Sequence, residues 1–338
     1  MELKKERRPG SEIVQSSQKS YPQPLQPGST KVTEHKESPE LILRKKKAHR
    51  VRAIKDWAMF TGYLSPSLIG VIVFFFLPLL MLLKTSFQKS STNTDFVGIK
   101  NYTRTITNTA FKDASLNTLK FAALAVPLAV LLALLLALLL NSGLPGRSIF
   151  RSILLNPMMV PVASVVLIWQ VFFSYNGVVN GWMLDLFGLD KIDWMKSDYS
   201  QIVILIMFLW KNLGYNMVLF LAALNNIPTE ILESASMDGA NALRRFFSIK
   251  MYYLGSTIFF VSIMSLVNSF KIFREVYLLT GDYPYKDLYM LQHFMNNAFR
   301  QLDYSKLSAG AIIMCVVMGV IVGGMFFAES RLDRDVEG

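Results

Sequence analysis

The sequence predicts an all-α integral membrane protein with six transmembrane helices. Hydrophobic residues make up 52% of the 338 residues and gather in long blocks, whereas a soluble amphipathic helix carries them on one face only. About 20 apolar residues cross a hydrocarbon core of roughly 30 Å, because an α-helix rises ~1.5 Å per residue. Six such blocks occupy residues 58–83, 121–140, 152–173, 202–224, 251–270 and 307–328.

The segment before the first block is a polar, basic tail. Residues 1–56 hold 14 Lys and Arg against 7 Asp and Glu, and they have few aromatic residues, so we expect this tail to be disordered. The first block is also far longer than the apolar core of a signal peptide, which has about 7–15 residues. The predicted organisation is therefore a disordered tail at 1–56 and a six-helix membrane domain at 57–330.

The formal charge of +11 does not indicate nucleic acid, because most of the excess lies in the tail beside a predicted span. Basic residues there orient the chain and contact anionic lipid headgroups. With both termini cytoplasmic, the tail, the loops at 141–151 and 226–250 and the C-terminal end hold 21 Lys and Arg. The opposite loops, 84–116, 174–201 and 280–306, hold 10. This excess predicts a multi-pass membrane protein with both termini on the cytoplasmic side.

Residues 227–250 interrupt the apolar blocks with a short amphipathic helix–turn–helix. Pro228 suits a first helical turn, and Gly239 can adopt the left-handed conformation that ends a helix. We expect Asp238 to cap the second helix. The segment is interpreted either as a docking element for a cytoplasmic partner or as a helix pair lying among the lipid headgroups.

The stretch "EILESASMDGANALRRFFSI" resembles the EAA loop of ATP-binding-cassette (ABC) importer permeases, which reads Glu-Ala-Ala, three residues, Gly, nine residues, Ile-x-Leu-Pro. Ser234 replaces the first Ala, and Tyr252 stands where the closing Pro is usual, so we expect a smoother entry into the fifth span. "GVVN" and "LWKNLGYNMVLFLAALNNIP" are also similar to the maltose-type sugar permeases. The matching residues are Glu233, Ala235, Asp238, Gly239, Ala240, Phe246 and Ile249.

The resemblance covers about residues 57–328 and implies a type I ABC importer architecture. It implies that the matching residues couple the chain to an ABC ATPase dimer, that a second homologous permease completes the pathway, and that an extracytoplasmic sugar-binding protein delivers the cargo. Glu233 would pair with a basic group of the ATPase, and Gly239 would make the turn. Loops 174–201 and 280–306 would meet the binding protein.

Polar side chains at membrane depth are costly and often functional. Amides bind sugar hydroxyls and aromatic faces pack on sugar C–H groups, so the candidate cargo path is formed by five residues; each could instead join helices by hydrogen bonds. These candidates are Trp210, Asn212, Tyr215, Asn216 and Asn268. Lys211 has no acid nearby on its own helix, so we expect it to pair with an acid of a partner subunit.

The chain lacks the motifs of an enzyme. No Gly-x-x-x-x-Gly-Lys-[Ser/Thr] loop, His-Glu-x-x-His or Gly-x-Ser-x-Gly occurs, so ATP hydrolysis is expected in separate subunits. One cysteine, Cys315, offers neither an internal disulfide nor a cysteine-based metal site, and we expect no cofactor. The alternative is a stand-alone secondary transporter for a small polar solute, for which Glu275 near a span end is the only candidate ion-coupling acid.

Overall fold

The computed structural model describes residues 55–337 apart from residues 58 and 91 and residue 144, and the side chains of residues 332–337 are not described. The predicted tail at 1–56 lies outside the described residues except for its last two. The described residues fall into two units, one that ends at Ile69 and one that begins at Gly70. All regular structure in the described part is helical, with one isolated β-bridge between Gln88 and Phe96.

Six helical segments are long and apolar enough to cross a membrane, which confirms the predicted fold class. Each overlaps one of the predicted blocks. The segments are Lys55–Ser86, Thr109–Asn141, Val162–Phe187, Ser200–Asn225, Ala242–Thr280 and Tyr304–Arg331.

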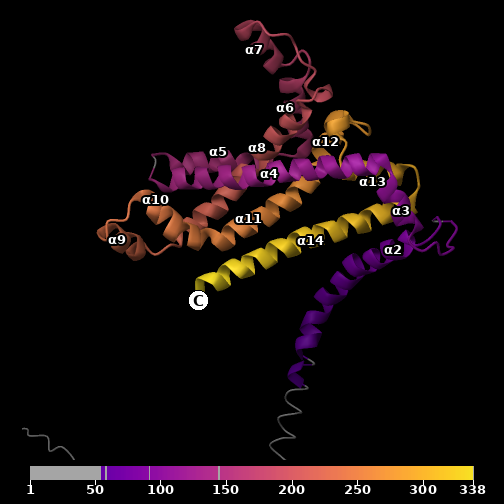
Figure 1. Ribbon diagram of the computed structural model, residues 1–338, viewed down its shortest axis with the longest axis horizontal. Coiled ribbons are helices and arrows are strands. Elements are labelled where there is room, and N and C mark those ends of the chain that lie inside the picture. Colours follow the sequence, from indigo (N-terminus) through magenta and orange to yellow (C-terminus); the bar gives the residue numbers. More distant parts are fainter. Residues whose placement is uncertain (1–54, 58, 91, 144, 338) are drawn as a thin grey trace, which may run out of the picture. The chain divides into compact units, whose positions relative to one another are not determined.

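Three helices form the centre of the larger unit: α4 (Thr109–Asn141), α8 (Ser200–Asn225) and α11 (Met251–Lys271). They run side by side and contact one another (Figure 1). Alanines on one stripe of α4 are fully buried, and small residues let neighbouring helix backbones approach closely. Two apolar clusters result, one around Phe208 and one around Phe220 of α8.

A close backbone approach joins α8 to α5 (Arg147–Met159). A Cβ atom added at Gly214 of α8 would lie 1.8 Å from the carbonyl oxygen of Leu154. No side chain fits at that distance, so this position needs glycine.

The predicted position of the third span, 152–173, is wrong. The helix breaks at Val160, and α6 (Val162–Phe173) begins after Pro161, so the third candidate span is Val162–Phe187. Val160 is extended (φ −73°, ψ 129°), because the ring of Pro161 disfavours the helical conformation of the residue before it.

The remaining helices flank this centre. In Figure 1, α9 and α10 lie near one end of α4, while α3 and α13 lie near the other. The last helix packs against α2, α3 and α13, and exposed apolar side chains cover its outer face, as expected for lipid or another membrane subunit. The bounds are η1 Ile72–Phe76, α2 Leu77–Ser86, α3 Lys100–Thr107, α7 Val178–Phe187, η2 Trp194–Lys196, α9 Thr229–Met237, α10 Ala242–Arg245, η3 Phe246–Lys250, α12 Phe273–Thr280, η4 Lys286–Leu288, α13 Leu291–Arg300 and α14 Tyr304–Glu337.

Candidate functional site

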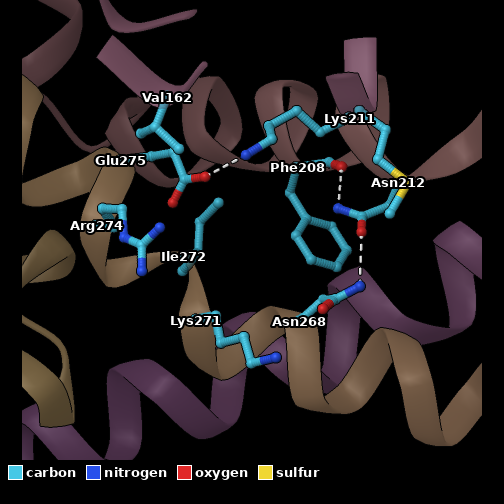
Figure 2. A pocket seen from close by; sticks show the side chains of 10 residues that line it. Val162, Phe208, Lys211, Asn212, Asn268, Lys271, Ile272, Arg274 and Glu275 are labelled. Carbon is cyan, nitrogen blue, oxygen red and sulfur yellow. Dashed lines mark hydrogen bonds and ion pairs between the residues drawn. The ribbon is translucent and has the colours of Figure 1, made fainter. Parts of the chain in front are cut away.

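A cavity of about 240 Å³ lies at mid-height of α8, between α8 and the segments around the α5–α6 and α11–α12 junctions. Its wall combines apolar side chains with amides and charged groups (Figure 2). The lining residues are Met158, Val162, Phe208, Lys211, Asn212, Asn268, Lys271, Ile272, Arg274 and Glu275.

Two helix interruptions create this cavity. Met158 and Val162 flank the break at Pro161, and Lys271 and Arg274 flank Ile272, where α11 ends and α12 begins. Irregular backbone at membrane depth is tolerated where it is buried in protein or lines a cavity. Broken helices at such a place are typical of solute-binding sites in transporters.

Two of the predicted path residues meet in the cavity. Asn268 of α11 donates from Nδ2 to Oδ1 of Asn212 on α8 at 2.9 Å, and Asn212 donates to the carbonyl oxygen of Phe208 at 2.8 Å (Figure 2). Both amides are half-buried. The pair links the two helices and leaves the carbonyl oxygen of Asn268 beside the cavity as an acceptor.

Lys211 is paired within its own chain, so the expectation of an acid from a partner subunit is wrong. Its ammonium group donates to Oε1 of Glu275, and the two side chains are 18% and 7% exposed. Glu275 lies beyond the fifth apolar block, and the turn at Ile272 brings it to the middle of α8. Direct contact between the two groups is needed here, because burying either charge without its partner would cost several kcal/mol of stability.

Lys271 and Arg274 are cavity residues that were not among the predicted site residues. Among the residues that the structure describes, neither has a hydrogen bond or ion pair for its charged group. Since Lys211 and Glu275 cancel, the cavity wall carries two net positive charges. The signal in the sequence was a pair of cations just after an apolar block, but the break that turns them toward the cavity was not evident.

Residues 227–250 form a second candidate site, away from the cavity. Helix α9 ends in a Schellman motif: the N–H of Ala240 donates to the carbonyl of Ala235 at 2.9 Å, and that of Gly239 donates to Ser236 at 3.1 Å. Gly239 has φ +79°, the left-handed conformation that the sequence predicts for it. Nothing lies within 4 Å of a Cβ added there, so the turn surface is open.

The cap of the second short helix is Asn241, not Asp238 as predicted. Oδ1 of Asn241 accepts from the backbone N–H of Arg244 at 2.8 Å, whereas Asp238 lies at the end of α9. The Gly239 turn needs two further residues before the chain can re-enter a helix, which moves the cap forward. From Ala242 the chain is helical through η3 into α11, so the passage past Tyr252 is as smooth as expected.

This segment is attached to the membrane core by apolar side chains, of which Ile227 is itself a buried member of the cluster around Phe220. Leu232 of α9 and Phe246 of η3 pack against the buried cluster around Phe220, which includes residues of α4, α8 and α11. Glu233 and Asp238 are exposed, Ala235, Ala240, Phe246 and Ile249 are half-buried, and Leu243 and Phe247 are mostly exposed apolar side chains. A force on the exposed side of α9 and α10 would therefore reach the spans directly.

Comparison with known proteins identifies the family of the chain. Residues 125–338 match the family described as "Binding-protein-dependent transport system inner membrane component". The chain belongs to this family. It is therefore a multi-pass permease subunit of an ABC importer and not an enzyme, which confirms the expected resemblance and decides against a stand-alone transporter.

Individual relatives of the permease support the same assignment. It is 30% identical to the trehalose/maltose transport system permease protein MalF of Thermococcus litoralis, over 76% of this chain and 89% of the relative. It is 32% identical to the probable ABC transporter permease protein YesP of Bacillus subtilis, over 84% and 94%. The fold is similar to a chain in the crystal structure of a bacterial ABC transporter that imports the acidic polysaccharide alginate (TM-score 0.73, 22% identity, 84% and 99% covered).

The other three path candidates do not line the permease cavity. Asn216 is fully buried and donates from Nδ2 to the hydroxyl of Ser265 at 2.9 Å, a bond that joins α8 to α11. Trp210 packs its ring on Trp169 of α6 with centroids 5.2 Å apart. Tyr215 is half-buried on α8. Asn216 therefore links α8 to α11, and Trp210 links α8 to α6.

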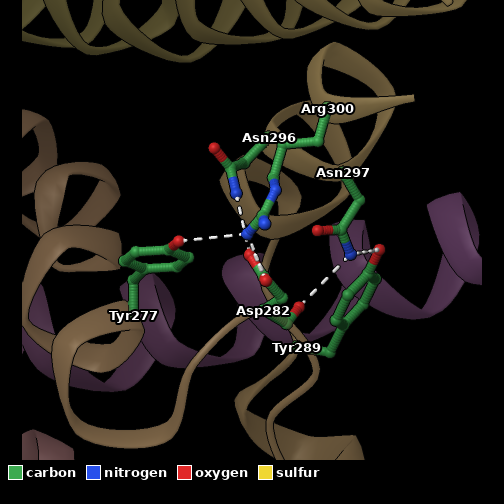
Figure 3. Close-up of polar contacts among 6 residues, drawn as sticks. All are labelled: Tyr277, Asp282, Tyr289, Asn296, Asn297 and Arg300. Carbon is green, nitrogen blue, oxygen red and sulfur yellow. Dashed lines mark hydrogen bonds and ion pairs between the residues drawn. The ribbon is translucent and has the colours of Figure 1, made fainter. Parts of the chain in front are cut away.

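A polar cluster holds α12 to α13 of the permease (Figure 3). Asp282 forms an ion pair with Arg300, and its carbonyl accepts from Nδ2 of Asn297 at 3.2 Å. The hydrogen bond that Arg300 donates to the carboxylate of Asp282 raises the pKa of Arg300, and burial raises the pKa of Tyr289, whose hydroxyl accepts from Asn297. These contacts fix the segment that follows the Lys211–Glu275 pair.

Proposed function

We propose that this permease moves a carbohydrate across the bacterial inner membrane through the cavity of Figure 2, together with a second homologous permease. An ABC ATPase dimer drives the movement by docking on residues 227–250. The observation that carries the proposal is the attachment of the exposed helix–turn–helix to the spans through Leu232 and Phe246.

The proposed coupling residues have different chemical roles. Gly239 makes the turn that lets α9 and α10 enter a cleft as one knob, and Glu233 offers a charge for a basic ATPase group. Leu243 and Phe247 supply exposed apolar surface for the same cleft. The ATPases can shift the permease between two conformations only if they bind one of them more tightly than the other.

The proposed orientation places both termini and residues 227–250 in the cytoplasm. It rests on the distribution of Lys and Arg described above. The segments 174–201 and 280–306 then lie on the other face, where the sugar-binding protein of the system delivers its cargo.

The proposal of a carbohydrate cargo rests on the Asn212–Asn268 pair and on the relatives. Planar amides suit sugar hydroxyls, since they both donate and accept. A similar protein transports trehalose and maltose by its name.

The test is uptake of labelled oligosaccharides, neutral and acidic, by cells that carry or lack the gene. The deletion strain is complemented with the wild type, Gly239→Val or Gly143→Val. Gly143 also has a positive φ (+84°) with open space around it, so valine is strained equally at both positions, but Gly143 lies outside the proposed knob.

We expect Gly239→Val to reach the membrane at the normal level and to lower uptake at least tenfold, while Gly143→Val transports normally. ATPase activity of the purified complex should persist without transport, or the ATPase should no longer co-purify. Normal uptake by Gly239→Val would refute the coupling role, and deletion without effect on any oligosaccharide would refute carbohydrate import.

A further inference from the structure

We propose that the cargo of this cavity is an anionic carbohydrate, whose carboxylate or phosphate group is bound by Lys271 and Arg274. The inference rests on the proposed function and deepens it by naming the charge of the cargo. A uronic acid and a sugar phosphate share the chemistry that these two cations would recognise.

The first step is the charge of the cavity wall. Three basic residues and one acid line it, and Lys211 already neutralises Glu275 by direct contact. Lys271 and Arg274 remain without an ion pair or hydrogen bond in the described part of the chain. A site for neutral sugars needs amides and aromatic faces but no unpaired cation.

The second step is the exposure of these unpaired cations. Both lie in the last third of the candidate span Ala242–Thr280, and their side chains are exposed beside the cavity, where a solute can reach them. Intramembrane charges of this kind pair with one another or mark a solute pathway. Glu275 is occupied, so a transported anion is the partner that the cavity chemistry points to.

The third step is the arrangement around the cavity. Lys271 follows Asn268 by one helical turn on α11, and Figure 2 shows their side chains on the same wall. Arg274 reaches the cavity from the other side of the break at Ile272 (Figure 2). A planar guanidinium binds two oxygens of a carboxylate or phosphate at once, while the amides bind hydroxyls of the same sugar.

The experiment compares probes with and without the anionic group, in the deletion strain complemented with each variant. One pair of probes is labelled trigalacturonate and its carboxyl-reduced counterpart. The other pair is labelled glucose 6-phosphate and glucose. For each probe, only the uptake that depends on this gene is compared. The test variant is Lys271→Gln/Arg274→Gln. The charge-conserving variant is Lys271→Arg, which keeps both charges and the guanidinium of Arg274, and Lys120→Gln is a matched control, because Lys120 is an exposed lysine of a span outside the cavity.

We expect gene-dependent uptake of an acidic probe that the double glutamine variant lowers at least tenfold. The charge-conserving variant should retain most of it, and Lys120→Gln all of it. Loss with trigalacturonate alone identifies a carboxylate, and loss with glucose 6-phosphate alone identifies a phosphate.

Three results would overturn the inference. Gene-dependent uptake of neutral probes alone refutes an anionic cargo but leaves carbohydrate import standing. Equal uptake of an acidic probe by the wild type and the double glutamine variant refutes the role of these cations. Loss of uptake in the charge-conserving variant as well, at normal membrane levels, shows a structural role instead. Deletion without effect on any probe refutes the proposed function itself.

Discussion

Lys211 of α8 forms an ion pair with Glu275 of α12, 64 positions further along the chain. The pair lies at the wall of the cavity and connects a continuous helix with one that begins after a break. Because both groups are largely buried, neither can be removed alone without leaving an uncompensated charge. The pair therefore fixes α12 relative to α8, and with it the position of Arg274.

The first prediction concerns this pair. Glu275→Gln leaves the Lys211 ammonium buried without its counter-charge, and we expect a loss of about 3 kcal/mol in the free energy of unfolding. Lys211→Met/Glu275→Leu replaces both charges with apolar groups and should recover most of that loss. Thermal unfolding of the purified permease measures both. A double variant no more stable than Glu275→Gln would contradict the pairing.

The second prediction concerns the contact of α8 with α5. Gly214→Ala places a methyl group against the carbonyl of Leu154, so the helices must separate, at a cost of about 1–3 kcal/mol for overpacking. Gly255→Ala on α11 is the matched control, because nothing lies within 4 Å of a Cβ there. The yield of folded protein and its melting temperature should fall for Gly214→Ala only. Equal melting temperatures for the two variants would contradict the close contact between Gly214 of α8 and the Leu154 carbonyl of α5.

Composition was sufficient to predict the six spans, but not where a span is interrupted. Pro127 and Pro157 lie inside α4 and α5 without ending them, whereas Pro161 ends its helix. All three read alike in sequence, because the outcome depends on whether neighbouring helices stabilise the freed backbone groups. The position of the third span was therefore not predictable from the pattern.

The same limit applies to the cavity. Asn212 and Asn268 lie within the fourth and fifth apolar blocks, so a contact between them could be predicted if these two spans pack side by side. Glu275 lies beyond the fifth block, and only the break at Ile272 brings it back to Lys211. The turn at Gly239 was predictable because few residues other than glycine adopt a positive φ there.

The third prediction is a pH dependence at His293 of α13. Its ring is fully buried against Phe273 and Tyr289, and burial lowers its pKa to about 4, although Asp282 opposes the shift. Nδ1 accepts from the N–H of Met290 at 3.2 Å, and Nε2 has no partner among the described residues. The folded state therefore favours the neutral ring.

The sign follows from the lowered pKa. The unfolded chain binds a proton below about pH 6.5 and the folded one only near pH 4, so stability is complete above pH 6.5 and falls between the two values. From pH 7 to pH 5.5 we expect a loss of about 1 kcal/mol from this residue. Glutamine can accept the same hydrogen bond but does not titrate, so His293→Gln should abolish this part of the dependence. Identical profiles of melting temperature against pH would refute it.

The fourth prediction concerns Asn180, which holds the segment after α7. Its side chain is fully buried, donates to the carbonyls of Tyr175 at 3.0 Å and Ile192 at 2.7 Å, and accepts from the indole of Trp194 at 2.9 Å. Asn180→Leu keeps the branched shape of the side chain but removes these bonds, and each buried group left unsatisfied costs about 1–3 kcal/mol.

We expect residues 188–197 to open locally in Asn180→Leu, which limited proteolysis and amide hydrogen exchange of the purified permease would detect. Asn176→Leu is the matched control, because Asn176 is exposed and its single bond, from Lys191 at 3.1 Å, lies on the surface. Its exchange rates should match the wild type. If binding-protein-stimulated ATP hydrolysis also falls in Asn180→Leu alone, this segment takes part in contact with the binding protein. Wild-type protection of residues 188–197 in Asn180→Leu would show that the apolar contacts of Trp194 alone hold the segment.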